Sequence, residues 1–532
     1  MSNVTPFLTL AVLDIDGHRV GLSFGPSVTV HWGDDKSLPD NIGGMTQTFT
    51  AGMVSCSLPS YTSSAIDASL ADSGASLTLA IGECEALQQV QTRARLQASR
   101  ATIFAWRDGQ TLSQSKVLFE GVVRSPSIDL SRGEISMQIA PNAFEVNATQ
   151  PLRKVGDPGR FPCIGSPRGR VPENNEDRAL PVVYGYVRNV SVPACELYTE
   201  EIDNASQDFV GLVVASHRVV GAPGTPGFVR LAADEAGELD DLYEIQVRTD
   251  GLGDEFSYVQ VNVMDWEDSI HVVEMIGKPS SRRGAVGMSG IGEVLVDLLR
   301  ARGPSASRNT DFSIAVPEAE KMNKFEVGFA LNEMDEQQTM FDIVRSRLEG
   351  QYPFVMAAPR GRYAIFSTEF PSASQTPAAH IIYGQNTFDR GAVTQSALSS
   401  VRNRFSFTFG YDGSADAEAE SIEVNGDNNV LCAASLSMWG PTPIQALSYP
   451  DCPTAVGAGA LVDDVVARLT KVRWNVQYSY VGDEFLDMPL RSVVLVTDEE
   501  LGWYEMRFIV ESISPDAQSG TTSVKLISSD AA

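Results

Sequence analysis

The stretch LFEGVVRSPSIDLSRGEISMQI, residues Leu118–Ile139, decides the fold class. Its second arm sets Ile135, Met137 and Ile139 on one face and polar residues on the other, which is the two-residue period of a half-buried strand. Between the arms, Gly133 and its polar neighbours are typical turn residues. The stretch therefore predicts a β-hairpin with one buried face and one wet face.

Strand patterns of the same kind fill the chain from its start to about Asn142, with Gly, Pro, Asp or Ser between the apolar runs. The first run, FLTLAVL, has no basic residue before it, so it lacks the layout of a secretory signal and predicts a strand. A helix is predicted near Glu85–Arg100, where the apolar residues are sparse. The segment Lys154–Asp177 is rich in Gly, Pro and charge, so we expect a linker or long loop there.

A second β-rich section follows the linker and runs to about Val273. In YEIQVRTDG, Tyr243, Ile245 and Val247 alternate with polar residues before the turn residue Asp250. The segment FSYVQVNVMD continues the same pattern. This section predicts a small separate domain.

Near Ser289 the apolar period changes to that of a helix. Apolar residues recur at spacings of three and four, at Ile291, Val294, Leu295, Leu298 and Leu299. Ser289 is the expected N-cap, and Gly303 and Pro304 are expected to end the helix. A second helix is predicted over Asp335–Leu348, and the hairpin YPFVMAAPRGRYAIF follows with its turn at residues 359–361. These patterns predict an α+β section.

The last section begins with the strand pattern RFSFTFGY, residues 404–411. It continues with a helix over 458–469 and the alternating strand RWNVQYSY, residues 473–480. Two further strands are expected at 506–513 and 523–527. A sheet that is apolar on one face and polar on the other forms half of a sandwich or curves around a water-filled bore, and periodicity does not choose between them.

Length and charge set limits on the protein class. The chain has 532 residues, more than the roughly 250 to 300 that one hydrophobic core holds, so we expect four domains, at 1–165, 166–285, 286–392 and 393–532. The predicted fold class is therefore mainly β with α+β parts in a multidomain chain. A net charge of -28 disfavours a surface that grips DNA. The acidity either aids solubility or lines a channel that a polyanion passes without sticking. No apolar run is long enough to span a membrane.

No pattern in the chain predicts a catalytic, cofactor-binding or metal site. The six cysteines form no C-x-x-C and the five histidines no metal-ligand spacing, so buried free thiols and structural histidines are expected. Gly287–Gly292 lacks the spacing of a phosphate loop, and Asp203–Asp208 and Glu423–Asn429 share only composition with calcium loops. The acidic pairs at 240–241, 463–464 and 499–500 are expected on turns or solvated helix faces.

Two groups of motifs run through the second and last sections. LPVVYGYVRNVSVPACEL, residues Leu180–Leu197, contains the pattern P-x-x-Y-G-x-V. The last section has a strand that begins with Asn, a helix rich in Ala, an alternating strand and a hairpin with T-D and L-G. The residues in those places are Asn403, Ala455, Ala460, Thr497, Asp498, Leu501 and Gly502. In order and character these motifs resemble the tail tip hub proteins of tailed phages (siphophages and prophages), a baseplate-hub-like family. The resemblance covers most of the chain, but 418–442 is ill matched.

The resemblance implies a structural protein of the virion tail tip, assembled in the host cytoplasm. Sections 1–165 and 393–532 would each form a tail-tube-like β-barrel domain, with 166–285 (β-rich) and 286–392 (α+β) as smaller accessory domains. A homotrimer would adapt the sixfold tail tube to threefold tip components and line the DNA ejection channel, through which DNA passes without specific binding. The implied partners are the tail tube, distal tail proteins, the tape-measure protein, and tail fibres or a spike.

Two other functions stay open. A host-surface glycan-binding adhesin predicts exposed aromatic clusters on loops, whereas most aromatic residues here fall at alternating strand positions. A glycan-degrading or wall-degrading enzyme predicts paired carboxylates or metal ligands at suitable spacing, which we do not find in the sequence. We therefore expect a hub that is not an enzyme and uses no cofactor.

Overall fold

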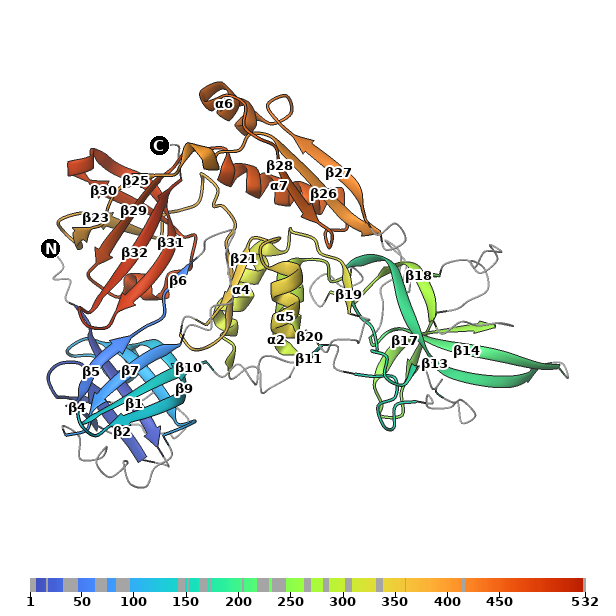
Figure 1. Cartoon of the computed structure of the whole chain (residues 1–532), viewed down its shortest axis with the longest axis horizontal. Coiled ribbons are helices and arrows are strands. Elements are labelled where there is room, and N and C mark those ends of the chain that lie inside the picture. The colour runs from blue at the N-terminus through green and yellow to red at the C-terminus, as the bar shows by residue number, and fades with distance from the viewer. Residues whose placement is uncertain are drawn as a thin grey trace.

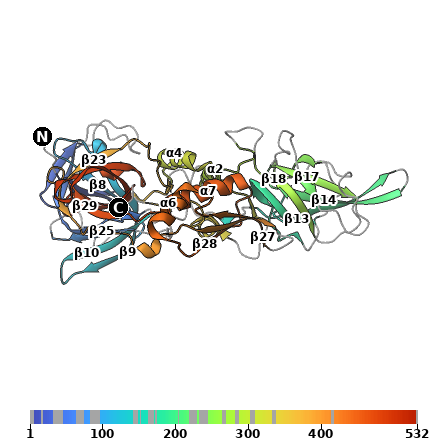
Figure 2. The ribbon, with the colours of Figure 1, turned by 90° about the horizontal axis from the view of Figure 1, so that it is seen from above.

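The computed structural model describes residues 6–15, 18–31, 46–62, 74–82, 96–141, 149–150, 153–161, 171, 175–202, 205–217, 229–231, 245–262, 269–280, 287–301, 309–331, 338–358, 360–412 and 417–529. Within these ranges the protein is mainly β, with several separate sheets and an α+β middle part, so the predicted fold class is confirmed. Figure 1 shows two large sheets at the left, the helical part in the centre and a further sheet at the right. Seen from above in Figure 2, these parts lie in a row.

Nine strands from the first part of the chain form one sheet in the order β3-β4-β2-β1-β8-β9-β10-β7-β5. Their bounds are β1 Leu8–Ile15, β2 His18–Ser23, β3 Val28–His31, β4 Thr46–Ala51, β5 Met53–Ser57, β7 Ala75–Ala80, β8 Arg100–Trp106, β9 Lys116–Asp129 and β10 Glu134–Ala140. The predicted hairpin is confirmed, because β9 and β10 pair antiparallel and Ile135, Met137 and Ile139 are buried. The helix predicted near Glu85–Arg100 lies almost wholly outside the described residues.

This N-terminal sheet closes through a single segment of chain. β4 pairs with β2 near one end of the strand order, β5 pairs with β7 at the other end, and only Gly52 separates β4 from β5. The Gly52 N–H donates to the Ser23 carbonyl, and the Ala80 N–H donates to the Gly52 carbonyl. The single segment made of β4, Gly52 and β5 therefore pairs first with β2 and then with β7, and its backbone hydrogen bonding continues through Gly52.

Apolar side chains fill the interior of the N-terminal sheet. Fully buried members come from six strands and include Ala11, Leu13, Leu22, Ala75, Leu79, Ile103, Phe119, Ile135 and Ile139. Cys56 belongs to the same cluster, and burial raises the pKa of its thiol to about 12, so it stays uncharged at neutral pH. The described side chains therefore form a solid core inside this sheet, with no aqueous bore through it.

The C-terminal sheet has the order β23-β30-β31-β32-β29-β24, with β25 paired to β29 and β6 paired to β31. The bounds are β6 Tyr61–Thr62, β23 Ala379–Ile382, β24 Thr387–Arg390, β25 Thr394–Gln395, β29 Trp474–Tyr480, β30 Val493–Asp498, β31 Trp503–Asp516 and β32 Thr521–Ser528. The strands predicted at 473–480, 506–513 and 523–527 are confirmed. This sheet closes as the first one does, because β23 pairs with β30 at one edge and β24, directly after it, pairs with β29 at the other.

The alternation along β29 separates the inside of the C-terminal sheet from its outside. Val476, Tyr478 and Tyr480 are buried in a cluster with side chains from β30, β31 and β32, whereas Gln477 is exposed. The apolar face predicted for this strand is therefore the inner face of a closed sheet, and its polar face lies outside.

The second section of the chain forms a six-stranded sheet in the order β15-β18-β13-β14-β17-β16, at the right of Figure 1. Its strands are β13 Tyr186–Ile202, β14 Ala205–Ala215, β15 Val229–Leu231, β16 Ile245–Thr249, β17 Glu255–Asn262 and β18 Ser269–Ile276. The predicted strands in YEIQVRTDG and FSYVQVNVMD are confirmed as β16 and β17. The long antiparallel pair β13 and β14 extends farthest from the centre of the molecule.

The centre of the molecule is an α+β part. It contains α2 Ile291–Arg300, α4 Phe312–Met322, α5 Met340–Ile343 with a π-helical turn Val344–Leu348, and the hairpin of β21 Phe354–Ala357 and β22 Ala364–Ser367. Short pairs join it to earlier segments: β11 Thr149–Gln150 with β20 Gln338–Thr339, and β12 Val182–Tyr184 with β19 Phe329–Leu331. The helix predicted from Ile291 and the hairpin with its turn near 359–361 are confirmed.

Two details of the predicted helices are wrong. The N-cap of α2 is Gly290 rather than Ser289, and the Asn323 side-chain oxygen accepts the Glu293 N–H in place of a capping side chain. The second helix begins at Met340 rather than Asp335, because the Thr339 hydroxyl caps it by accepting the Asp342 N–H.

A three-stranded sheet and two helices cover the α+β part. The sheet has the order β27-β26-β28, with bounds β26 Phe405–Asp412, β27 Ala417–Val424 and β28 Gln445–Tyr449, and the helices are α6 Val430–Trp439 and α7 Ala455–Leu469. Phe405, Phe407 and Phe409 are buried in one cluster with α2 and α4. RFSFTFGY and RWNVQYSY therefore lie in different sheets, although both fall in the last section. The ill-matched segment 418–442 holds most of β27 and all of α6.

A buried carboxylate ties the ends of the C-terminal sheet together. Asp498 on β30 is fully buried, its Oδ2 lies 2.7 Å from Arg390 Nη1, and Tyr478 donates its hydroxyl to the same oxygen at 2.8 Å. Burial and the neighbouring Asp498 raise the pKa of Tyr478 well above its usual value, so the tyrosine remains a donor. Arg390 also contacts Glu500, whose side chain is 64% exposed.

We predict that Asp498→Ala lowers the free energy of unfolding by about 3 to 5 kcal/mol, because it leaves the Arg390 guanidinium and the Tyr478 hydroxyl without their buried acceptor. Glu500→Ala removes the exposed partner of the same Arg390 and should cost under about 1 kcal/mol. Urea unfolding of both variants measures the difference. Equal losses would contradict a special role for the buried carboxylate.

Candidate functional site at the junction of the closed sheets

The calcium-loop-like segment and the acidic pairs named from the sequence make structural contacts where the structure describes them. In Glu423–Asn429, side-chain oxygens of Asn425 and Asn429 accept backbone N–H groups of the turn and of α6. Asp463 is exposed as expected, but Asp464 is buried and paired with Arg468 at 2.7 Å, contrary to the expectation of a solvated face. Residues 203–204 and 240–241 lie outside the described ranges.

The cysteines and histidines of the described ranges gather at no metal site. No group of three or more His, Cys, Asp or Glu side chains is placed to hold an ion in that part of the chain. Cys56, Cys195, Cys432 and Cys452 are buried and free, as predicted, while residues 84 and 163 fall outside the description. His217 Nε2 accepts the Val183 N–H, a bond that serves the backbone.

What the structure does assemble is a junction between the two closed sheets. The turn between β31 and β32 reaches the N-terminal sheet, where the Thr9 hydroxyl donates to the Ala517 carbonyl at 2.9 Å and the Phe7 N–H to the Gly520 carbonyl at 3.2 Å. Ala517 and Leu486 are members of the apolar cluster inside the N-terminal sheet region. Apolar contact and backbone hydrogen bonds therefore hold the two sheets together.

Ion pairs extend the junction to the α+β part. Asp483 lies 3.0 Å from Arg107, and Asp487 lies 2.7 Å from Lys116, so both carboxylates of the C-terminal sheet region face cations of the N-terminal sheet. Asp487 also pairs with Arg360, in the turn of the β21–β22 hairpin, and Arg360 donates to the Leu486 carbonyl at 3.0 Å. The Asp487 carboxylate thus joins its own part of the molecule to two others.

The backbone of the same hairpin turn touches the N-terminal sheet directly. The Glu120 N–H on β9 donates to the Arg360 carbonyl at 2.9 Å. Gly361 has a φ of +79°, and a Cβ there would overlap the Glu120 carbonyl oxygen. Only glycine combines this backbone conformation with so close an approach. Sequence patterns had identified 359–361 as a turn, but nothing in them pointed to its distant partner.

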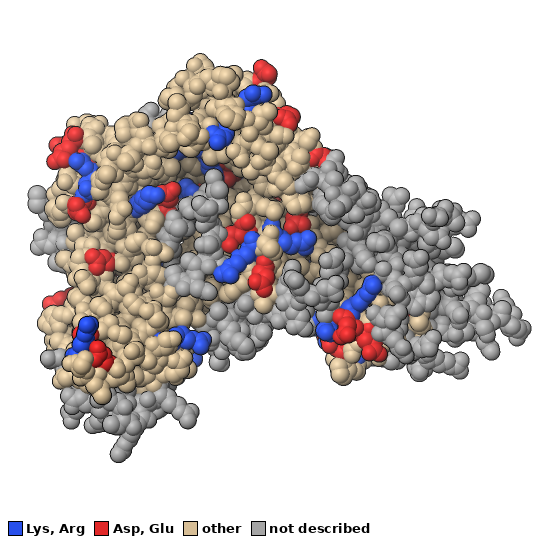
Figure 3. Space-filling model, in the orientation of Figure 1, with Lys and Arg blue, Asp and Glu red and all other residues tan. Residues whose placement is uncertain are grey.

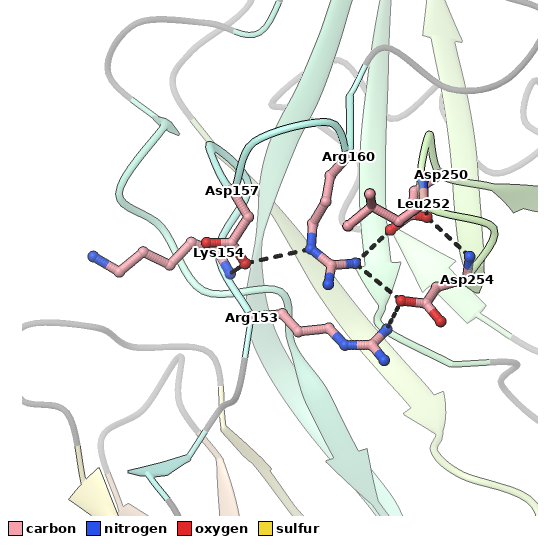
Figure 4. Close-up of polar contacts among 7 residues, drawn as sticks. All are labelled: Arg153, Lys154, Asp157, Arg160, Asp250, Leu252 and Asp254. Atoms are coloured by element: carbon pink, nitrogen blue, oxygen red, sulfur yellow. Dashed lines mark hydrogen bonds and ion pairs between the residues drawn. The ribbon is translucent and has the colours of Figure 1, made fainter.

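A second polar cluster fastens the linker to the six-stranded sheet. Figure 4 shows Arg160 between Asp157 on its own loop and the carboxylates of Asp250 and Asp254 on the β16–β17 turn. Arg153 reaches Asp254 from the other side at 2.9 Å. Arg160 is 8% exposed, and the three carboxylates keep its pKa raised despite its burial. The cluster is built to hold two segments together, since each charge in it faces a protein partner.

The surface is mixed in charge. On the face drawn in Figure 3, acidic and basic side chains lie beside one another in small groups with neutral surface between them. The helices of the described ranges are too short or too polar to cross a bilayer.

The chain was compared with known protein families, curated proteins and solved structures. No family model and no curated protein matches the chain. Among solved structures, it is similar to a chain from the virion of a native gene transfer agent particle, with 11% identity and a TM-score of 0.40, covering 69% of this chain and 87% of the other. It is also similar to the 43 kDa tail protein of prophage MuSo2 from Shewanella oneidensis (9% identity, TM-score 0.33, 98% of both chains). A tail protein from Neisseria meningitidis MC58 aligns at 8% identity and a TM-score of 0.33, over 98% of this chain and 96% of that one.

The solved structures to which this chain is similar are thus phage tail proteins and virion components. With TM-scores below 0.5 and identities of 8 to 11%, they do not carry a functional assignment. We therefore argue function from the chain's own sheets and junction.

We predict that Gly361→Ala destabilises the junction more than Gly350→Ala does. Both glycines have a positive φ, +79° and +83°, so each substitution costs about 1 kcal/mol of backbone strain, but a Cβ at Gly350 meets no atom within 4 Å. The overlap with Glu120 should add about 1 to 3 kcal/mol at Gly361. Chemical unfolding, with hydrogen exchange at β9 as a local readout, tests this; identical behaviour of the two variants would refute the close contact.

Proposed function

We propose that this protein is a structural hub of a phage-like tail tip, in which three copies form a ring around a channel. Each copy would contribute its two closed sheets, giving six tail-tube-like barrels that meet a sixfold tube on one side and threefold components on the other. The domains would be 1–165 and 393–532 for the ring, with 166–285 and 286–392 as accessories. The strands β23 and β24, at 379–390, complete the C-terminal closed sheet from the accessory side of that boundary, and the sheet of β26, β27 and β28 packs on the α+β part. The observation that carries the proposal is that two closed sheets from opposite ends of one chain are joined by backbone hydrogen bonds and ion pairs.

These contacts support the role because a ring of six similar barrels from three chains needs a fixed angle between the two barrels of each chain. Backbone hydrogen bonds from Phe7 and Thr9, the ion pairs at Asp483 and Asp487, and the contact at Gly361 all act on that angle. A hinged pair would not close a ring of one diameter.

The solid cores determine where a channel can lie. Since the described side chains fill both sheets, DNA would pass between copies, along the outer faces of their strands. The outer face of β29 and β32 is polar, with Gln477 donating to Ser523 at 2.7 Å and Lys525 paired with Glu511. Around Gln477 and Ser523 this face offers few cations to phosphates, which suits transit without binding.

The proposal also covers the partners, the location and the role of the protein. The partners would be the tail tube, distal tail proteins and tape-measure protein on one side and fibres or a spike on the other, in a virion whose tip is assembled in the host cytoplasm. The long β13–β14 pair at the far end of the accessory sheet is available for such contacts. The role would be mechanical, without catalysis or a cofactor.

We predict that the purified full chain forms rings. Light scattering should give three times the chain mass of 57.4 kDa at high concentration, and electron micrographs should show threefold particles with a central hole. Gly361→Ala should lower the fraction of closed rings, and Gly350→Ala should not. A monomer at every concentration that binds host glycans on an array would reject the hub and support the adhesin.

A further inference from the structure

A large cavity lies on the opposite side of the C-terminal sheet from its core. It has a volume of about 610 Å³ and is bounded by α7, by β28 of the three-stranded sheet and by the outer face of the C-terminal sheet, including Asn475 and Ile527. Figure 3 shows Lys and Arg side chains in the recess between the upper and left-hand parts of the molecule. A volume of this size holds a ligand of several tens of atoms.

The lining of the cavity is basic, unlike the chain as a whole. Two carboxylates, Asp464 and Glu511, line it. Five cationic residues line it too: Arg402, Arg468, Lys471, Arg473 and Arg491. The lining therefore carries a net charge of about +3, from five cations and two carboxylates, in a protein whose net charge is -28.

Both carboxylates already have cationic partners. Asp464 pairs with Arg468 and also accepts the Phe370 N–H at 2.7 Å, and Glu511 pairs with Lys525 at 2.8 Å. Their charge is thus largely compensated within the protein. The cations that line the cavity therefore outnumber the carboxylates there.

Two of the cations are held in place before any ligand arrives. Arg473 is 3% exposed, donates to the Ser528 and Ala467 carbonyls, and stacks on the Phe370 ring at 4.2 Å. Arg491 is 8% exposed, and burial together with the nearby Arg468 lowers its pKa to about 9. An anion in the cavity would reduce this repulsion between like charges.

The cavity wall is also partly apolar. Leu447, Val465 and Leu469 line it and are only partly buried by the protein core. Bare phosphate or a nucleic-acid backbone gains nothing from these side chains, and a polyanion is repelled by the strongly acidic chain. A short segment with one or two carboxylates and an apolar side chain matches both parts of the wall.

We propose that this cavity binds an acidic, partly apolar peptide segment of a neighbouring protein. The carboxylates of the segment contact Lys471 and Arg402 beside the fixed Arg473, and its apolar side chain packs on Leu447 and Val465. The site depends only on α7, β28 and the outer face of the C-terminal sheet near Asn475 and Ile527, so a single copy forms it whether or not three copies form the proposed ring. The bound segment would attach the partner protein where the three-stranded sheet meets the C-terminal sheet.

The test uses the full chain and a fluorescein-labelled short peptide of alternating aspartate and leucine, followed by fluorescence anisotropy at physiological ionic strength. The wild-type protein should bind it saturably. Lys471→Glu should weaken binding about tenfold or more, because it replaces an attractive charge with a repulsive one. Lys471→Gln only removes the charge, so it should weaken binding by less. Thermal unfolding checks that each variant is folded.

Matched controls separate the cavity from general charge effects. Arg132→Glu makes the same kind of charge reversal at a side chain that is 72% exposed in the β9–β10 turn, and it should leave binding unchanged. The peptide with asparagine for aspartate, and the one with serine for leucine, should each bind at least tenfold more weakly. Absence of saturable binding, or equal affinity of wild type and Lys471→Glu, would overturn the proposal. Tighter binding of labelled single-stranded oligothymidylate, lost in Lys471→Glu, would overturn it in favour of a nucleic-acid site.

Discussion

The need to cover the edges of two curved sheets governs this structure. An open edge exposes unpaired N–H and C=O groups and invites another chain to pair with it. Here one segment serves both edges of each sheet, β4 and β5 in the first and β23 and β24 in the second, because it changes partner strand midway. The change needs only Gly52 in one sheet and a short turn in the other. Once closed, each sheet hides one face completely and can fill it with apolar side chains.

Closed sheets also explain why the junction is polar at its rim. The inner face of each closed sheet is filled by its own core, so contact between the two sheets relies on what their turns and outer faces offer. The β31–β32 turn inserts Ala517 toward the first core, and around it Asp483 and Asp487 face Lys116, Arg107 and Arg360. Half-exposed ion pairs contribute little stability one by one. Their value here is in fixing orientation, since Asp487 contacts both the N-terminal sheet and the α+β part at once.

Local patterns predicted local structure well. The hairpin of β9 and β10, the helix α2, the helix α7 and the strand β29 each show a clear period, and each formed as expected. α4 was missed because Pro317 interrupts its pattern, and α6 because its residues are apolar on all sides and show no period. The junction was out of reach for a different reason: Gly361 and Glu120 are separated by 241 positions, and no local pattern encodes such a contact.

Local sequence patterns also cannot show which face of a strand with alternating polar and apolar residues lies inside the protein. An apolar and a polar face along RWNVQYSY fit a sandwich, a bore or a closed sheet equally well, because period two reports only that the faces differ. The pairing of β24 with β29 and β23 with β30 settles which face is inside. With Tyr478 and Tyr480 inside, Gln477 and Ser479 lie on the outer face of the sheet. The described side chains of one copy leave no opening inside this sheet, so the channel that we propose would have to be enclosed by several copies together.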